Sequence, residues 1–255
     1  MSNDPKKSLG IGLAGFGTVG TGVWETFERN AELISNRSDV QVDIVRIAVR
    51  DLSKARIDGV SGDKFTTNWQ DVVDDADVDI VVELIGGTDT AFDIVAAALR
   101  AIENCQHPDA QALRETVLPQ FFERWSAEAL VIDSWFSIQA SSSRSGAIAR
   151  VEALMEHAAF SLTTPNRMRS VLGGFAMNIG AFHEAGGAGY RLLAETVIAL
   201  NGFNPQMAAR MLGPLTGWRK FDPKYGAGMQ AALQMILDSG ELSPDVFEVV
   251  TKTLA

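Results

Sequence analysis

The chain changes character near residue 100, and this change constrains its fold more than any single motif does. Residues 8–100 alternate short apolar runs with stretches of helical periodicity, whereas residues 101–255 show helical periodicity with almost no strand pattern. Alternating strands and helices indicate parallel strand pairing, and short helices with short connections indicate a superhelix or an irregular bundle. We therefore predict an α/β domain over residues 1–100 and an all-α domain over residues 101–255.

The composition is that of a soluble globular protein. Of the 255 residues, 46% are hydrophobic and 21% are charged. No apolar run approaches the length of about 20 residues that spans a bilayer. The polar N-terminus is not followed by an apolar signal core, and the single cysteine, Cys105, excludes an internal disulfide. These features predict a cytoplasmic protein with no membrane association.

The charge of the chain argues against one class of partner. The formal net charge is −10, and neither domain carries a basic stretch. Because an acidic chain repels the phosphate backbone of nucleic acids, we expect no nucleic-acid partner.

The expected elements of the first domain follow the order of a Rossmann fold. Apolar runs at 9–14, 42–49 and 79–85 are typical of buried parallel strands, and an amphipathic helix ends near residue 36. With a further short segment around Phe65, they make a partial Rossmann domain, the first half of a doubly wound sheet. In the second domain, turn residues separate helices expected at 90–101, 110–126, 128–140, 145–156, 165–178, 188–200, 204–212, 225–239 and 243–253.

A glycine-rich turn, Gly15-Phe16-Gly17-Thr18-Val19-Gly20, joins the first expected strand to the first expected helix. In such a turn the first glycine permits a tight bend, the second lets the backbone approach a pyrophosphate, and the third lets helix and strand pack closely. The N-terminus of the helix adds unbonded N–H groups and the positive end of its dipole. The pattern indicates a dinucleotide site in a truncated dinucleotide-binding domain, and a purely structural glycine turn is the alternative.

The residue after the second strand bears on the choice of dinucleotide. This residue is Arg50, where an acid would bind the ribose 2′-hydroxyl of NAD, and an arginine can accept the 2′-phosphate of NADP. Lys54 and Arg56 follow closely, while Asp51 opposes the trend. We expect NADP in preference to NAD, and a solvated charged loop is the alternative interpretation.

Three separated segments of residues 8–100 resemble the N-terminal part of homoserine dehydrogenase. They are IGLAGFGTVG (11–20), IAVRDLSKAR (47–56) and VELIGGT (82–88), in the order of that family. The resemblance implies NAD(P) binding by Gly15, Phe16, Gly17, Thr18, Val19, Gly20, Arg50, Gly86 and Gly87. The family's Ala-Asn-Lys segment, whose lysine is catalytic, occurs nowhere in this chain. We therefore expect weak residual NADP(H) or adenine-nucleotide binding and no catalytic residues.

Residues 98–255 are similar to the C-terminal helical domain of bacterial aminopeptidase N, a zinc enzyme. The matching segments are ALVIDSWFSIQA (129–140), PNRMR (165–169), GYRLL (189–193), NPQMAARMLGPLTGW (204–218) and FEVVTKTLA (247–255). In that family the zinc-binding His-Glu-x-x-His helix lies in another domain. Here His183-Glu184 is followed by Gly187 where the second histidine would stand, so we expect no zinc site. We expect Trp125, Trp135, Phe136 and Trp218 to be core aromatics.

The two resemblances together predict a chimera joined within one helix near residues 96–101. Two alternatives to nucleotide binding remain open. The chain could be a structural or interaction module with a vestigial glycine turn, or an NADP-dependent oxidoreductase of the homoserine dehydrogenase type. The last strand, 79–85, would leave an open apolar edge. We expect the helical half or a second copy of the chain to cover this edge, the latter giving a homo-oligomer.

Overall fold

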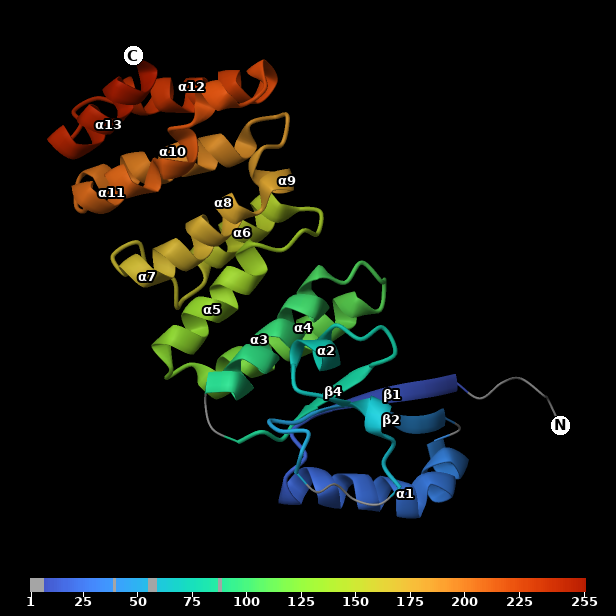
Figure 1. Ribbon diagram of the computed structural model, residues 1–255. Helices are drawn as coiled ribbons and strands as arrows, with labels where there is room; N and C mark the ends of the chain where they lie inside the picture. The colour runs from blue at the N-terminus through green and yellow to red at the C-terminus, as the bar shows by residue number, and fades with distance from the viewer. Residues whose placement is uncertain (1–6, 39, 55–58, 87–88) are drawn as a thin grey trace. The chain divides into compact units, whose positions relative to one another are not determined.

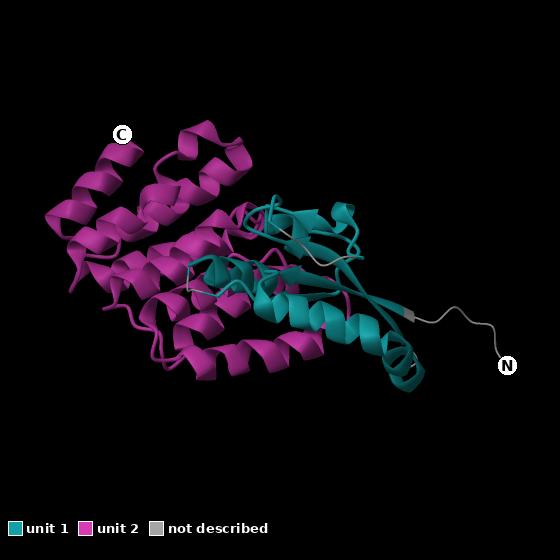
Figure 2. Cartoon of the chain, turned by 60° about the horizontal axis from the view of Figure 1, so that its bottom comes forward, with its two compact units in different colours: residues 1–99 teal, residues 100–255 magenta. Residues whose placement is uncertain are grey.

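The computed structural model describes residues 7–38, 40–54, 59–86 and 89–255. These residues form two compact units, unit 1 up to Leu99 and unit 2 from Arg100 to Ala255 (Figure 2). Unit 1 contains a parallel sheet and unit 2 is helical, which confirms the predicted fold class (Figure 1).

The sheet of unit 1 has four parallel strands in the order β3-β2-β1-β4. They are β1 (Lys7–Ala14), β2 (Val40–Ala48), β3 (Phe65–Thr66) and β4 (Ile80–Glu83). In register, Ala14 at the end of β1 lies beside Ala48 of β2 on one side and Glu83 of β4 on the other. Three strands therefore end together at one edge of the sheet, where parallel sheets of this kind place their ligands.

Helix α1 (Thr18–Ser38) packs on one face of this sheet, beneath β2 in Figure 1. Trp24 of α1 is buried in a core that includes Leu13 and Ile47 of the two central strands. The ring of Phe16 meets the ring of Phe65 edge-to-face, with centroids 5.4 Å apart. A short helix, α2 (Gln70–Val73), also packs near β1 and β2 and buries Val72. The glycine turn thus joins a buried strand to a helix that packs on the same core.

Helix α3 (Asp89–Asn104) begins in unit 1 and ends in unit 2, since the boundary falls within it. Most of the helices that follow pack against a neighbour in sequence, and α10 also packs on α12 and α11 on α13, so unit 2 is a stack of helices running from α4 to α13 (Figure 1). Their bounds are α4 Ala110–Trp125, α5 Ala129–Ala140, α6 Ala147–Glu156, α7 Pro165–Met168, α8 Gly174–Met177, α9 Ile179–Phe182, α10 Ala188–Asn201, α11 Pro205–Met211, α12 Pro223–Leu237 and α13 Pro244–Leu254.

Two expectations for unit 2 need correction. The single helix expected at 165–178 is interrupted by a π-helical turn, Arg169–Gly173, where the chain packs closely on α5. A side chain at Gly174 would come within 3.2 Å of Ser137, a tight contact that glycine avoids. Trp125 is not a core residue, because 38% of its surface is exposed, whereas Trp135 and Phe136 are buried as expected.

A charged cluster is buried in unit 2 around Glu103, which has no exposed surface. Its Oε1 accepts hydrogen bonds from Nε and Nη2 of Arg144, at 3.2 and 2.5 Å, and lies 3.7 Å from Nε of Arg150. Arg150 also donates to backbone oxygens of Gln139 and Ser142. Since charges are buried only when they are paired, Glu103 holds the end of α3 to the loop between α5 and α6.

Across the described ranges, every helix is either too short or too polar to traverse a bilayer.

Candidate functional site

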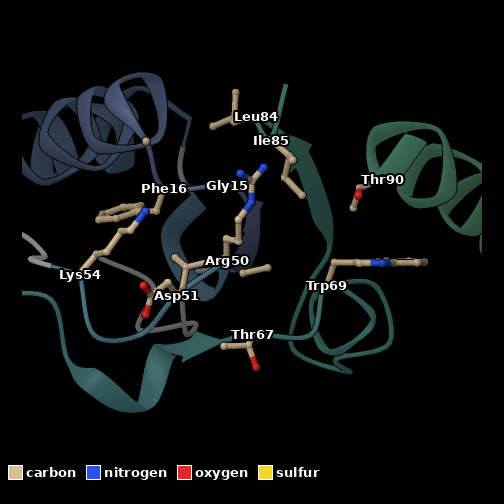
Figure 3. Close-up of a pocket in the computed structure, with 13 residues that line it drawn as sticks. Gly15, Phe16, Arg50, Asp51, Lys54, Thr67, Trp69, Leu84, Ile85 and Thr90 are labelled. Atoms are coloured by element: carbon tan, nitrogen blue, oxygen red, sulfur yellow. The ribbon is translucent and has the colours of Figure 1, made fainter. Parts of the chain in front are cut away.

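A cavity of about 480 Å³ opens at the edge of unit 1 where β1, β2 and β4 end (Figure 3). This volume is within the range of small-molecule sites. Its walls come from the glycine turn, the segments after β2, β3 and β4, and the first turn of α3. The lining residues are Gly15, Phe16, Gly17, Ala48, Val49, Arg50, Asp51, Lys54, Thr67, Trp69, Leu84, Ile85 and Thr90.

The three glycines of the turn differ in what an added side chain would meet. Gly15 has a φ of +112°, and a side chain there would lie 2.6 Å from the backbone of Leu84. A side chain at Gly20 would lie 2.4 Å from the backbone oxygen of Gly15. A side chain at Gly17 would meet no atom within 4 Å and would project into open space. Gly15 and Gly20 are therefore structural, and Gly17 keeps the cavity clear.

The N-terminus of α1 gives the cavity an anion-attracting wall. The helix begins at Thr18, next to the lining residue Gly17, and has no acidic residue in its first turn. Its first hydrogen bond runs from the Thr21 N–H to the Gly17 oxygen, at 2.9 Å. The N–H groups that precede Thr21 in a helix of this length have no carbonyl to bond, and the dipole adds partial positive charge. This wall suits a phosphate or another anion.

A second positive contribution comes from the segment after β2. Arg50 is exposed, and its guanidinium points into the cavity between Gly15 and Ile85 (Figure 3). Within the ranges that the structure describes, the guanidinium of Arg50 has no hydrogen-bond or ion-pair partner. The ammonium-bearing side chain of Lys54 lines the same cavity. Two basic residues therefore line the cavity, and Figure 3 shows the ammonium of Lys54 beside Phe16.

The one acidic side chain in the lining is turned toward its own loop. Oδ1 of Asp51 accepts hydrogen bonds from the backbone N–H of Ser53 at 2.9 Å and from its hydroxyl at 2.7 Å. These bonds form a local turn that orders the loop after Arg50. Asp51 thus has a structural role within its own loop.

The structure brings four of the expected site residues together in the lining: Gly15, Phe16, Gly17 and Arg50. Thr18, Val19 and Gly20 form the first turn of α1 behind them. Gly86, with a φ of +73°, directly follows the lining residue Ile85, and Gly87 lies outside the described residues.

Sequence reasoning missed Thr67, Trp69 and Thr90, which also line the cavity. A signal for the first two existed: they follow β3, and parallel strands bring their carboxyl ends to one edge. Thr90 is placed there by the start of α3.

His183, which raised the question of zinc, and a second histidine of unit 2, His157, both have hydrogen-bond partners. Nδ1 of His183 is 2.7 Å from the hydroxyl of Tyr190, and Nδ1 of His157 accepts the backbone N–H of Ala159 at 3.1 Å. Burial lowers the pKa of both imidazoles, and the positive charge of Arg167 lowers the pKa of His157 further. Among the described residues, no group of three or more His, Cys, Asp or Glu side chains is arranged to hold a metal ion.

These lowered pKa values predict that unit 2 loses stability in mild acid. The unfolded chain, with histidine pKa values near 6.5, binds protons that the folded chain does not. The free energy of unfolding should therefore fall as the pH drops through this value. We expect a lower melting temperature at pH 5.5 than at pH 8, and a smaller difference for His157→Phe. An equal pH dependence in wild type and variant would contradict this assignment.

Unit 1 is thus a half of a Rossmann domain with a glycine-lined, cationic cavity, and unit 2 is a helical stack. A family model described as "Domain of unknown function (DUF3458_C) ARM repeats" matches residues 33–255, so the chain belongs to this family. The helical region aligns with aminopeptidase N from Caulobacter vibrioides, 41% identical over 142 residues, 55% of this chain and 16% of that protein. Legionella pneumophila aminopeptidase A, crystallised with aspartic acid, matches 63% of this chain and 18% of its own, with 32% identity and a TM-score of 0.59.

A different part of the chain is similar to homoserine dehydrogenase. The protein from Methylobacillus glycogenes is 43% identical over 103 residues, which are 40% of this chain and 24% of that protein. The chain therefore spans less than a quarter of the length of the curated relatives named here. The similarity to two families over different parts of the chain confirms the predicted chimera.

Proposed function

We propose that unit 1 binds NADP(H) in the glycine-lined cavity and that the chain completes neither relative's reaction. The observation that carries the proposal is the convergence of Arg50, without a partner in the described ranges, and the α1 N-terminus on one cavity. A pyrophosphate at the helix N-terminus and a 2′-phosphate on Arg50 would match these charges. Unit 2 would serve as a helical scaffold.

The sequence supports the second part of the proposal. Homoserine dehydrogenase resemblance ends near residue 100, and no Ala-Asn-Lys segment occurs in the chain. Hydride transfer needs a substrate held against the nicotinamide, and after β4 the described chain continues into helices. We expect no NADP reduction with homoserine and no hydrolysis of an alanyl substrate with added zinc. Homoserine-dependent NADP reduction would contradict the proposal.

A thermal melt with and without NADPH tests binding directly. A ligand at about 1 mM with a Kd of about 0.1 mM adds about 1.4 kcal/mol to the free energy of unfolding. We expect an upward shift of the midpoint with NADPH and none with inorganic phosphate. A sharp melt with no NADPH shift would contradict nucleotide binding and favour an interaction module with a vestigial glycine turn.

Replacing Arg50 tests the preference for NADP. A charge-assisted hydrogen bond contributes about 1.5–3 kcal/mol, so Arg50→Ala should weaken NADP⁺ binding by about tenfold or more. NAD⁺ lacks the 2′-phosphate, so its binding should change little. Isothermal titration calorimetry measures both constants, and Arg37→Ala, an exposed position in the last turn of α1, is the matched control. An equal loss for the two dinucleotides would mean that Arg50 does not contact the 2′-phosphate.

A further inference from the structure

The loop between α6 and α7, residues 157–164, is tied to side chains of unit 2 through Ala159 (Figure 1). Its own turns are short: the N–H of Phe160 donates to the oxygen of His157, and the N–H of Thr164 donates to the oxygen of Ser161. The N–H of Ala159 donates to Nδ1 of His157 at 3.1 Å, and the oxygen of Ala159 accepts from Nη1 of Arg167 at 2.5 Å. One imidazole and one guanidinium therefore hold the two polar groups of the same residue.

The imidazole of His157 is anchored among aromatic rings. Its centroid lies 4.7 Å from the ring of Phe122 on α4, and 5.4 and 5.5 Å from the rings of Trp135 and Phe136 on α5. Trp135 and Phe136 are buried, and the contact is uncharged on each of these sides. Such surroundings favour the neutral imidazole, which is also the form that can accept the Ala159 N–H at Nδ1.

The charged groups near His157 come from α5, α6 and α7. The positive charge of Arg167 at the start of α7 acts on the imidazole. Asp133 of α5 faces Arg167 and accepts a hydrogen bond from its Nε at 2.6 Å. Glu156, which precedes His157 on α6, is exposed to solvent. A protonated His157 would lose its acceptor for Ala159 and would repel Arg167, so protonation acts against both contacts of Ala159.

We propose that this loop is an acid-sensitive switch: protonation of His157 releases residues 157–164 while the helices of unit 2 stay folded. The inference is independent of nucleotide binding by unit 1. In the released loop the imidazole reaches water and binds a proton that the closed loop excludes, so the open population rises as the pH falls below 6.5, the ordinary pKa of histidine. Between pH 8 and pH 5.5 this linkage increases the open population by up to about tenfold.

Hydrogen–deuterium exchange of the full chain, followed by mass spectrometry at pH 8 and pH 5.5 and corrected for intrinsic exchange rates, tests the switch. We expect the amides of residues 159–164 to exchange faster than those of the buried helix α10 at both pH values. Their protection should be about tenfold lower at pH 5.5 than at pH 8. In His157→Asn the side-chain oxygen can accept the Ala159 N–H but does not titrate, so the loop should be equally protected at both pH values.

Three results would overturn the inference. The first is loop protection that does not change with pH, and the second is a pH dependence that persists in His157→Asn. The third is loop exchange in step with α10, because the loop would then open only when the whole unit unfolds. If His157→Asn does not fold, the wild-type profile decides: loop exchange that rises through a single protonation below pH 6.5 supports the switch, and exchange without that rise excludes it.

Discussion

Replacing Glu103 with alanine should lower the free energy of unfolding of unit 2 by about 3–5 kcal/mol, because it leaves buried arginines without their carboxylate. Within the described residues, Glu103 is the only acceptor for the Arg144 side chain, of which 20% is exposed. Arg150 is more deeply buried, and both its burial and the charge of Arg144 lower its pKa. The negative charge of Glu103 balances the positive charges of Arg144 and Arg150, which lie close together.

An exposed ion pair provides the control for this prediction. Glu248 and Lys252 pair one turn apart on α13, with 63% and 74% of their side chains exposed. Solvent screens such pairs, so Glu248→Ala should leave the unfolding midpoint unchanged within error. Urea denaturation followed by circular dichroism at 222 nm, which is dominated by the helices of unit 2, compares the two variants. If Glu103→Ala is as stable as Glu248→Ala, the cluster has no net stabilising role.

The Glu103 cluster also marks the limit of what the sequence could predict. Glu103 and Arg144 are 41 residues apart, and charged residues in helices are usually solvated, so nothing local distinguishes this pair from surface charges. The prediction that Trp125 is a core residue was wrong for a related reason. Its helix, α4, has no clear apolar face. The sequence of α4 therefore does not indicate whether an aromatic residue on it is buried or exposed. Burial in a helical stack is decided by which helices pack together.

The sheet and the glycine turn were predictable because their signals are local. The apolar run of β1 is followed at once by the turn and by α1, and the mechanism of this motif requires that order. Thr67 and Thr90 reach the same cavity only through the strand order and the position of α3, which no local pattern specifies. Asp two residues before Ser is a known turn pattern, but composition alone does not predict the hydrogen bond that the Ser53 N–H donates to Asp51.

Valine at two of the glycines should separate folding from binding. In Gly20→Val the new side chain would lie 2.4 Å from the backbone oxygen of Gly15, so strand and helix must move apart. Overpacking costs about 1–3 kcal/mol, and a clash with backbone belongs at the upper end. Unit 1, whose core contains the buried Trp24, should then unfold at a lower temperature. NADPH binding should weaken with the loss of the fold.

Gly17→Val is the matched variant, because its side chain would meet no atom of the protein within 4 Å. Its melting temperature without ligand should equal that of the wild type. The valine would occupy the space through which a pyrophosphate approaches the backbone, so the NADPH-induced shift of the melt should disappear. A shift that persists in Gly17→Val would place the ligand away from the α1 N-terminus. In that case the positive charge of Arg50 and Lys54 alone would have to account for binding.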